Sequence, residues 1–185
     1  MLDRRPVPPH PERMHDPSHP TPWTATGAPA DKPALYDDLA REIDALLTGE
    51  PDPTANAANA AAAIYHSLGR LNWAGFYFLR GEELVLGPFQ GKPACVRIPL
   101  GKGVCGTAAT RRQSVLVPDV EAFPGHIACD MASRSELVVP LLDGDRLLGV
   151  LDMDSPDLAR FDAQDQAGCE AVAAIVVRHL RGSVL

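Results

Sequence analysis

The sequence predicts an α+β domain with a mixed or antiparallel sheet of about six strands, flanked by N- and C-terminal helices. Three observations support this. Leucines at helical spacing follow a proline-rich start, runs rich in aromatic and β-branched residues fill the middle, and an Ala/Val-rich helical pattern comes near the end. The 185 residues, of which 45% are hydrophobic, are enough for one core and therefore one domain.

The first 33 residues are expected to form an extended tail. They hold nine of the 18 prolines and the histidines His10, His15 and His19. Apolar residues are few and follow no period, so the segment cannot bury enough surface to offset its ordering entropy. We therefore place the domain at residues 34–185 and interpret the histidines as part of a solvated linker.

Two helices are expected at the start of the domain. Leu35, Leu39, Ile43 and Leu46 recur at helical spacing, between an early proline and a glycine stop. The second helix, over residues 54–68, is rich in alanine, which suggests close packing against a neighbouring element.

The strands are expected in the middle of the chain, at residues 72–79, 83–87, 94–99, 114–117, 136–142 and 146–152. Two hairpins turn at Arg80–Gly81 and Asp143–Gly144. The glycine-rich run GKGVCG opens a short helix ending near Arg112, and residues 118–135 form a long loop.

The last helix begins after Asp162, a capping residue, and runs to about Arg181. Its inward-facing residues are expected to include Ala167, Ala171, Ala174 and Val177.

Charge and hydropathy limit the function classes. The net charge of −7 argues against non-specific binding of nucleic acid. No apolar run approaches the ~20 residues of a membrane span, and the first residues lack the apolar core of a secretory signal. A cytoplasmic location is therefore expected, where thiols stay reduced and four cysteines do not form a structural disulfide framework.

The cysteines fall into two groups. Cys169 lies among alanines and valines of the last helix and is expected to be a buried, inert thiol. Cys95 on a strand, Cys105 at a helix opening and Cys129 in the long loop are candidates for a lowered pKa and nucleophilic chemistry. No short pair of the zinc-binding kind occurs, so no metal is expected. His126 is interpreted as an exposed loop histidine.

Three carboxylates are expected at one end of the sheet. Glu136 opens one strand of the second hairpin, and Asp152 and Asp154 close the other. Residues two apart on a strand point to the same face. Such acids repel one another unless one is protonated or a cation lies among them. The alternative is that strand ends simply reach water.

The aromatic run NWAGFYFL has two faces. Phe76 and Phe78 share the face expected to enter the core, whereas Trp73 and Tyr77 share the other with Gly75. An exposed Trp/Tyr pair beside a glycine is suited to form the wall of a pocket for an apolar group, although plain core packing is the alternative.

Taken in order, NWAGFYFL, ACVRIPLGKGVCG, the Cys129 loop, SELVVPLL and LGVLDMDS resemble the free methionine-R-sulfoxide reductases, which are small GAF-domain proteins. The resemblance covers residues ~35–181 and includes three cysteines with matching order and spacing. It leaves out the tail and Cys169. It implies a GAF-like fold and the reduction of free methionine sulfoxide.

The resemblance also implies roles for single residues. Cys129 is the expected nucleophile, which becomes a sulfenic acid, and Cys95 is expected to resolve it as an intramolecular disulfide. Cys105 matches a third cysteine that serves as a secondary resolver. A thioredoxin-type protein is the expected reductant, and no cofactor is expected. A homodimer is a further possibility.

The substrate pocket follows from the same resemblance. Glu136, Asp152 and Asp154 match acidic pocket residues, and Trp73 and Tyr77 match an aromatic wall. A neutral carboxylic acid can protonate the sulfoxide oxygen, with Glu136 and Asp154 as the candidates, and an ionised one can hold the substrate ammonium. Backbone N–H groups at a helix opening suit the substrate carboxylate, and these belong to residues 103–106, including Val104 and Cys105.

Two other function classes compete with the enzyme. One is a GAF ligand sensor, which usually accompanies an effector domain. The other is a thiol redox switch, which needs the cysteines but neither the acids nor Trp73.

Overall fold

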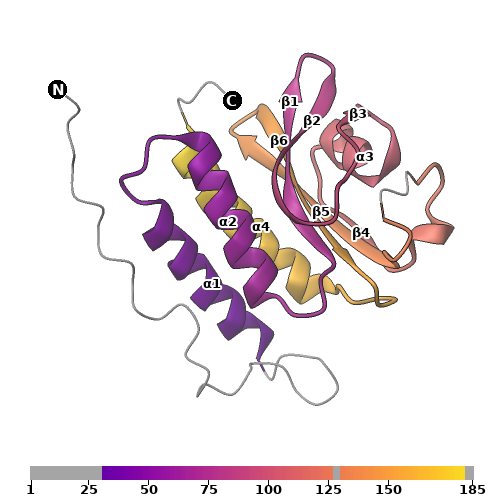
Figure 1. Cartoon of the computed structure of the whole chain (residues 1–185), viewed down its shortest axis with the longest axis horizontal. Coiled ribbons are helices and arrows are strands. Elements are labelled where there is room, and N and C mark those ends of the chain that lie inside the picture. The colour runs from indigo at the N-terminus through magenta and orange to yellow at the C-terminus, as the bar shows by residue number, and fades with distance from the viewer. Residues whose placement is uncertain (1–30, 127–129, 182–185) are drawn as a thin grey trace.

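One six-stranded antiparallel sheet, with three helices on one face and a short helix on the other, forms the framework of the protein (Figure 1). The structure is a computed structural model that describes residues 31–126 and 130–181. Both the helices and the number of strands agree with the predicted fold class. No helix in these residues is long and apolar enough to cross a membrane.

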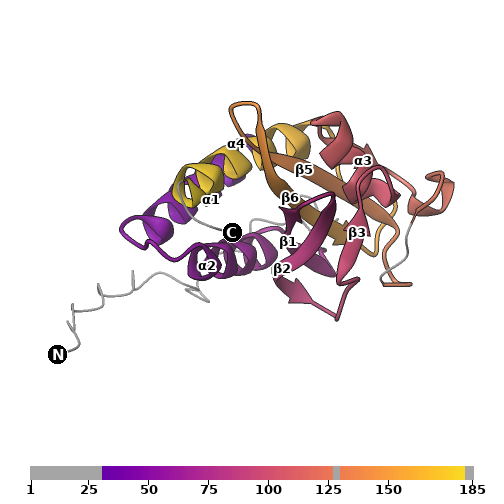
Figure 2. The same cartoon turned by 90° about the horizontal axis from the view of Figure 1, so that it is seen from above.

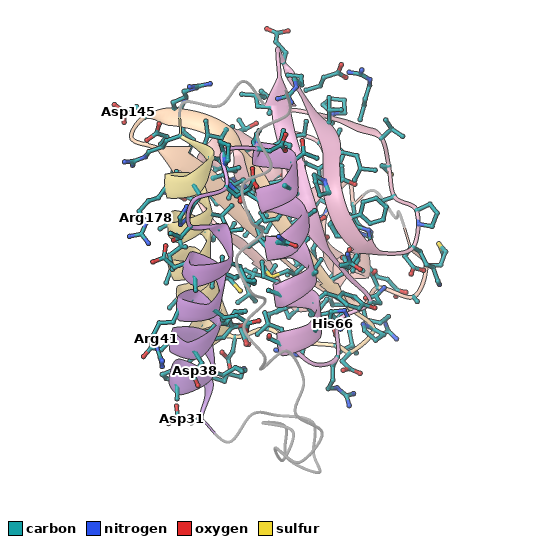
Figure 3. The ribbon with its side chains drawn as sticks, turned by 60° about the vertical axis from the view of Figure 1, so that its left-hand side comes forward. Asp31, Asp38, Arg41, His66, Asp145 and Arg178 are labelled. Carbon is teal, nitrogen blue, oxygen red and sulfur yellow. The ribbon has the colours of Figure 1, made fainter. Side chains whose placement is uncertain are left out.

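The helical layer consists of α1 (Lys32–Leu47), α2 (Pro53–Ser67) and α4 (Ala163–Leu180), which lie side by side (Figure 2). An aspartate caps each N-terminus, namely Asp31, Asp52 and Asp162. Helix α1 begins two residues before the predicted domain boundary. Charged side chains such as Asp38, Arg41 and Arg178 point outward from this layer (Figure 3).

The buried face of α4 differs from the predicted one. Of the four predicted inward residues only Val177 is buried, whereas Ala167, Ala171 and Ala174 are exposed. Alanine is too small to mark a face, because a helix tolerates it inside or outside. The large apolar residues decide the orientation, and the buried set includes Cys169, Val172, Val176, Val177 and Leu180.

The sheet has the order β3-β2-β1-β6-β5-β4. Its strands are β1 (Trp73–Arg80), β2 (Glu83–Gly91), β3 (Arg97–Pro99), β4 (Val115–Val117), β5 (Ser135–Asp143) and β6 (Arg146–Ser155). The hairpin between β5 and β6 turns at Gly144–Asp145, one residue later than predicted. Within the long loop, Val120–Ala122 forms a 3₁₀ turn, η1.

Cys95 precedes β3 instead of lying on a strand as predicted. Pro93, which has no N–H to donate to a ladder, lies in the connection between β2 and β3. The Tyr77 hydroxyl donates to the Cys95 carbonyl at 3.0 Å, so a side chain takes the place of a ladder partner there.

Strand alternation separates two apolar clusters, one on each face of the sheet. Phe76, Phe78, Leu137 and Met153 pack beneath the helical layer. On the other face, Trp73, Tyr77, Val138 and Val150 pack with α3 (Gly103–Arg111). This second face carries the candidate site.

Candidate active site

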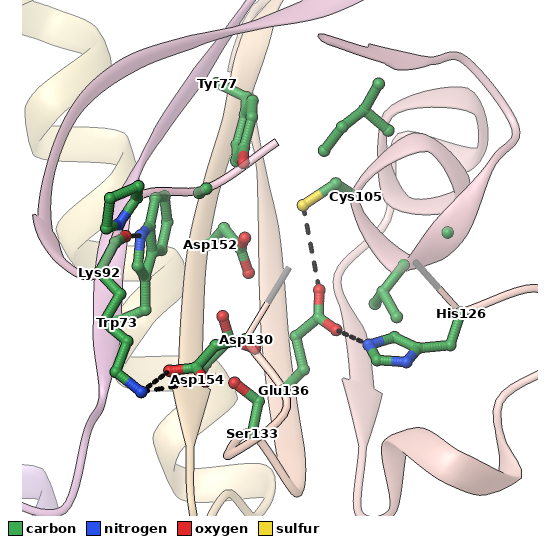
Figure 4. Close-up of a pocket in the computed structure, with 15 residues that line it drawn as sticks. Trp73, Tyr77, Lys92, Cys105, His126, Asp130, Ser133, Glu136, Asp152 and Asp154 are labelled. Atoms are coloured by element: carbon green, nitrogen blue, oxygen red, sulfur yellow. Dashed lines mark hydrogen bonds and ion pairs between the residues drawn. The ribbon is translucent and has the colours of Figure 1, made fainter. Parts of the chain in front are cut away.

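A pocket lies between the end of the sheet and the first turn of α3 (Figure 4). Its lining comes from β1, the β2–β3 connection, β3, α3, the long loop, β5 and β6. The lining residues are Trp73, Tyr77, Lys92, Pro93, Ala94, Ile98, Gly103, Val104, Cys105, His126, Asp130, Ser133, Glu136, Asp152 and Asp154.

The three predicted carboxylates meet in this pocket. Asp154 pairs with Glu136 across β5 and β6 and with Trp73 across β1 and β6. Asp152 lies two residues along β6, on the same face. The hairpin therefore places all three side chains on the pocket face, which confirms the juxtaposition expected from the chain reversal.

Burial controls the protonation of these acids. Together with the Asp152 and Asp154 charges, it raises the pKa of Glu136 well above its usual range. Burial and the Asp152 charge do the same for Asp154. Burial raises the pKa of Asp152 to only about 6. The cluster therefore keeps protons at pH values at which isolated, solvated carboxylates are already ionised.

The aromatic wall is buried rather than exposed. Trp73 and Tyr77 are 3% and 1% exposed, and their rings stack with centroids 5.8 Å apart. The predicted exposure is wrong because the β2–β3 connection covers the rings, where Trp73 Nε1 donates to the Lys92 carbonyl at 3.2 Å. The wall itself lines the pocket as expected.

Glycines bring α3 close to the sheet. Gly103 begins the helix at a φ of +60°, and a Cβ on Gly106 would lie 2.4 Å from the Pro99 carbonyl oxygen. Within the described residues, no side chain caps the N-terminus of α3. The first turn, with Val104 and Cys105, therefore presents the positive end of the helix dipole to the pocket.

Cys105 is a buried thiol, and the lowered pKa expected for a helix N-terminus is wrong. Its Sγ lies 3.9 Å from Glu136 Oε1. Burial and the charges of Asp152 and Glu136 raise its pKa well above the usual range. Loss of solvent and two neighbouring acids outweigh the helix dipole.

His126 lines the pocket, so its interpretation as an exposed loop histidine is also wrong. Its Nε2 lies 3.8 Å from Glu136 Oε2, its side chain is 17% exposed, and burial lowers its pKa. A loop has no periodic pattern from which the direction of a side chain could be predicted. The position of His126 three residues before Cys129 is the one sequence feature that places it near the candidate site.

Lys92, Asp130 and Ser133 also line the pocket, and no sequence pattern predicted them. Lys92 Nζ pairs with Asp130 Oδ2 at 3.2 Å, which links the β2–β3 connection to the long loop. Asn72 donates to Asp130 and to the Ser133 hydroxyl at 3.2 and 3.0 Å. These contacts join segments about 40 to 60 residues apart.

The cysteines are in different states. Cys105 and Cys169 are free thiols, and Cys95 is disulfide-bonded. Cys169 is buried against the Tyr36 hydroxyl and the Met153 sulfur in the core under the helical layer. A nucleophilic thiol must be accessible to its substrate, and this one is not. Cys129, the predicted nucleophile, lies outside the described residues.

Comparison with known proteins now identifies the family. Residues 52–180 match the GAF domain model. The free methionine-R-sulfoxide reductase of Escherichia coli is 51% identical over 143 residues, covering 77% of this chain and 87% of that protein. The chain belongs to the free methionine-R-sulfoxide reductase family of GAF-domain proteins. It is therefore an oxidoreductase, as the motifs predicted.

Further family members support this assignment. The free methionine-R-sulfoxide reductase of Saccharomyces cerevisiae is 42% identical over 153 residues, covering 78% of this chain and 85% of that protein. The X-ray structure of the Neisseria meningitidis enzyme in complex with its substrate superposes with a TM-score of 0.78 at 45% identity. It covers 85% of this chain and 92% of that chain.

Proposed function

We propose that this oxidoreductase reduces the R-sulfoxide of free L-methionine to L-methionine at the pocket beside α3. The observation that supports this most directly is the cluster of buried Glu136 and Asp152 with half-buried Asp154, facing both an aromatic wall and an uncapped helix N-terminus. Acids suit the substrate ammonium, the helix N-terminus suits its carboxylate, and the rings suit its methyl group.

Recognition of both backbone charges explains the preference for the free amino acid. In a peptide, neither the ammonium nor the carboxylate of an internal methionine sulfoxide exists. Asp152 and the first turn of α3 would then face neutral amide groups, which leaves buried polar groups without their charged partners.

We assign the proton donor to Glu136 and the ammonium contact to Asp152. Glu136 has a strongly raised pKa, so it keeps a proton at neutral pH. Asp152, with a pKa of about 6, is mostly ionised there. Asp154 lies between Trp73 and Glu136 in the strand register, and its charge adds to the burial that raises the pKa of Glu136.

The proposed chemistry passes the sulfoxide oxygen to a cysteine. The Cys129 thiolate attacks the sulfur while Glu136 protonates the oxygen, which leaves methionine and a Cys129 sulfenic acid. The Cys95 thiol then attacks the Cys129 sulfur, forming a disulfide and releasing water. A thioredoxin-type dithiol reduces that disulfide and is itself oxidised.

Cys95 is disulfide-bonded, which agrees with a redox role for it, whereas Cys105 and Cys169 are free thiols. Cys105 keeps its place as the proposed secondary resolver, because it lies in the same pocket as the substrate cluster.

The test is turnover with purified protein, thioredoxin and thioredoxin reductase. We expect methionine from the free R-sulfoxide, and little or none from the S epimer or from N-acetylated, C-amidated methionine sulfoxide. Binding of the free sulfoxide without methionine release would point instead to a ligand sensor. Disulfide cycling without any sulfoxide dependence would point to a redox switch.

A further inference from the structure

Three buried groups in the pocket have the chemistry of metal ligands. The Cys105 sulfur and one carboxylate oxygen each of Glu136 and Asp152 lie within 4.8 Å of one another. They come from α3, β5 and β6, so the set exists only in the folded chain. The short Cys pairs sought in the sequence mark another kind of site, in which neighbouring residues supply the ligands.

Asp152 supplies a second, independent observation. Asp152 is buried, with only 6% of the residue exposed. Its Oδ1 has no hydrogen-bond partner among the described residues. The carboxylate points into the pocket toward Cys105 and Glu136 (Figure 4). A buried, unpartnered carboxylate oxygen calls for a ligand that donates a hydrogen bond or carries positive charge.

The surrounding charges leave this cluster without a protein cation. Lys92 lines the pocket but pairs with Asp130. His126 lies beside Glu136, with Nε2 and Oε2 3.8 Å apart. Among the described lining residues these are the two basic side chains, so neither offsets the charge at Asp152.

We propose that this pocket binds a thiophilic divalent cation, best Zn²⁺, through Cys105 Sγ, Glu136 and Asp152. Zinc accepts sulfur and carboxylate ligands at about 2.0 to 2.3 Å, which places ligand atoms roughly 3.3 to 3.8 Å apart. The Sγ to Oε1 distance of 3.9 Å is already close to this range. Binding releases the Cys105 thiol proton and the Glu136 carboxyl proton to solvent and changes no oxidation state.

The bound cation excludes the amino acid substrate. It would occupy the place where Asp152 meets the substrate ammonium, a consequence that rests on the proposed function. Three protein ligands leave a fourth position for water. The cation is thus a reversible inhibitor of the pocket, with no part in turnover.

The test uses the oxidised full-length protein. Its disulfide at Cys95 prevents the redox cysteines from competing with Cys105 for the cation. Titration with Co²⁺, a spectroscopic substitute for Zn²⁺, is expected to give a near-ultraviolet thiolate-to-cobalt band that saturates at one equivalent. Zn²⁺ should abolish it. Cys105→Ala should remove the band, and Asp152→Asn should weaken binding about tenfold or more.

Two controls address other ligands. Cys169→Ala removes the second free thiol, and replacing His10, His15 and His19 together with glutamine removes the histidines of the N-terminal segment. Both variants should bind Co²⁺ as the parent does, and circular dichroism should show that every variant is folded. Absence of the band in the parent, or its persistence in Cys105→Ala, overturns the proposed site.

Competition with free methionine sulfoxide tests the exclusion. Saturating substrate should weaken apparent Co²⁺ affinity at least tenfold, and unchanged affinity overturns this part of the proposal. Turnover measured separately in the presence of a chelator keeps the two proposals apart. A protein that binds the cation but releases no methionine contradicts the proposed function alone.

Discussion

Glu136 and Cys105 both have raised pKa values because their side chains lie next to each other in a buried part of the pocket. The sulfur lies 3.9 Å from the carboxylate, and solvent reaches little of either group. Burial is the main cause of both raised pKa values, and the neighbouring acids add to it. A thiol kept protonated in this way is a poor nucleophile, which leaves the attack on the sulfoxide to another cysteine and Cys105 with only a secondary role in resolution.

The first prediction separates the two redox cysteines. Cys129→Ser should abolish methionine release, because the sulfenic acid requires sulfur at that position. Cys95→Ser should release about one methionine per chain and then stop, since the sulfenic acid has no resolving thiol. Rapid-quench measurement of methionine checks both. Full turnover by Cys129→Ser would show that the nucleophile is misassigned, and Cys169→Ala is the control expected to keep activity.

The second prediction separates the two acidic roles. Glu136→Gln should lower kcat about 10²- to 10³-fold with little change in KM, because it removes the proton donor. Asp152→Asn should mainly raise KM, about tenfold to a hundredfold, because it removes the ammonium contact. Steady-state kinetics at pH 7 measure the split. A reversed pattern would exchange the two assignments.

At the scale of elements, α3 and the β5–β6 hairpin together make the site. The hairpin sets the acids through strict alternation and register, and α3 supplies Cys105 and the uncapped amides. The helix can reach the sheet because Gly106 lies against the Pro99 carbonyl, without room for a side chain. The Gly101 N–H also donates to the Gly106 carbonyl at 2.9 Å.

The third prediction tests this close approach. Gly106→Ala should force α3 away from Pro99, lower the unfolding free energy by about 1 to 3 kcal/mol and raise KM more than it lowers kcat. Arg111→Ala, at an exposed site on the same helix, is the matched control with a smaller effect on both. Chemical denaturation and steady-state kinetics give the comparison. An unchanged KM in a folded Gly106→Ala protein would separate α3 from substrate binding.

At the scale of the molecule, one face of the sheet forms the main core and the other carries the candidate site. One packs against α1, α2 and α4 in a large apolar core. The other face places three acids in the pocket beside α3. Such a cluster costs stability, which the apolar core must offset. A cytoplasmic location and a homodimer stay predictions of the sequence.

The fourth prediction measures that cost through pH. Because folding raises the pKa of Asp152 from 3.8 to about 6, the folded state binds more protons than the unfolded state between these values. The Asp152 contribution to stability therefore falls as pH rises from about 4 to about 6. The full change corresponds to about 3 kcal/mol as an upper limit.

Asp152→Asn removes this contribution. The variant should be more stable than the parent at pH 7 by about 1 to 3 kcal/mol, with a difference that grows from pH 4 to pH 6. Urea denaturation across this range is the measurement, and Asp145→Asn, in the exposed hairpin turn, is the control. A difference that is constant with pH would contradict the assigned titration.

The sequence by itself determined the parts that depend on local periodicity. The aspartate cap of α4, the β5–β6 hairpin and the shared face of Asp152 and Asp154 all follow from spacing along the chain. The pairing of Glu136 with Asp154 follows once the chain reverses between the two strands. This is why the acidic cluster was predictable without a structure.

Only the tertiary structure decided the surroundings of these residues. His126 meets Glu136 although its loop segment has no periodicity, and Trp73 is buried because the β2–β3 connection covers it. The raised pKa of Cys105 depends on acids 31 and 47 residues away in the chain. Desolvation is a property of everything packed around a group, so local sequence does not contain it.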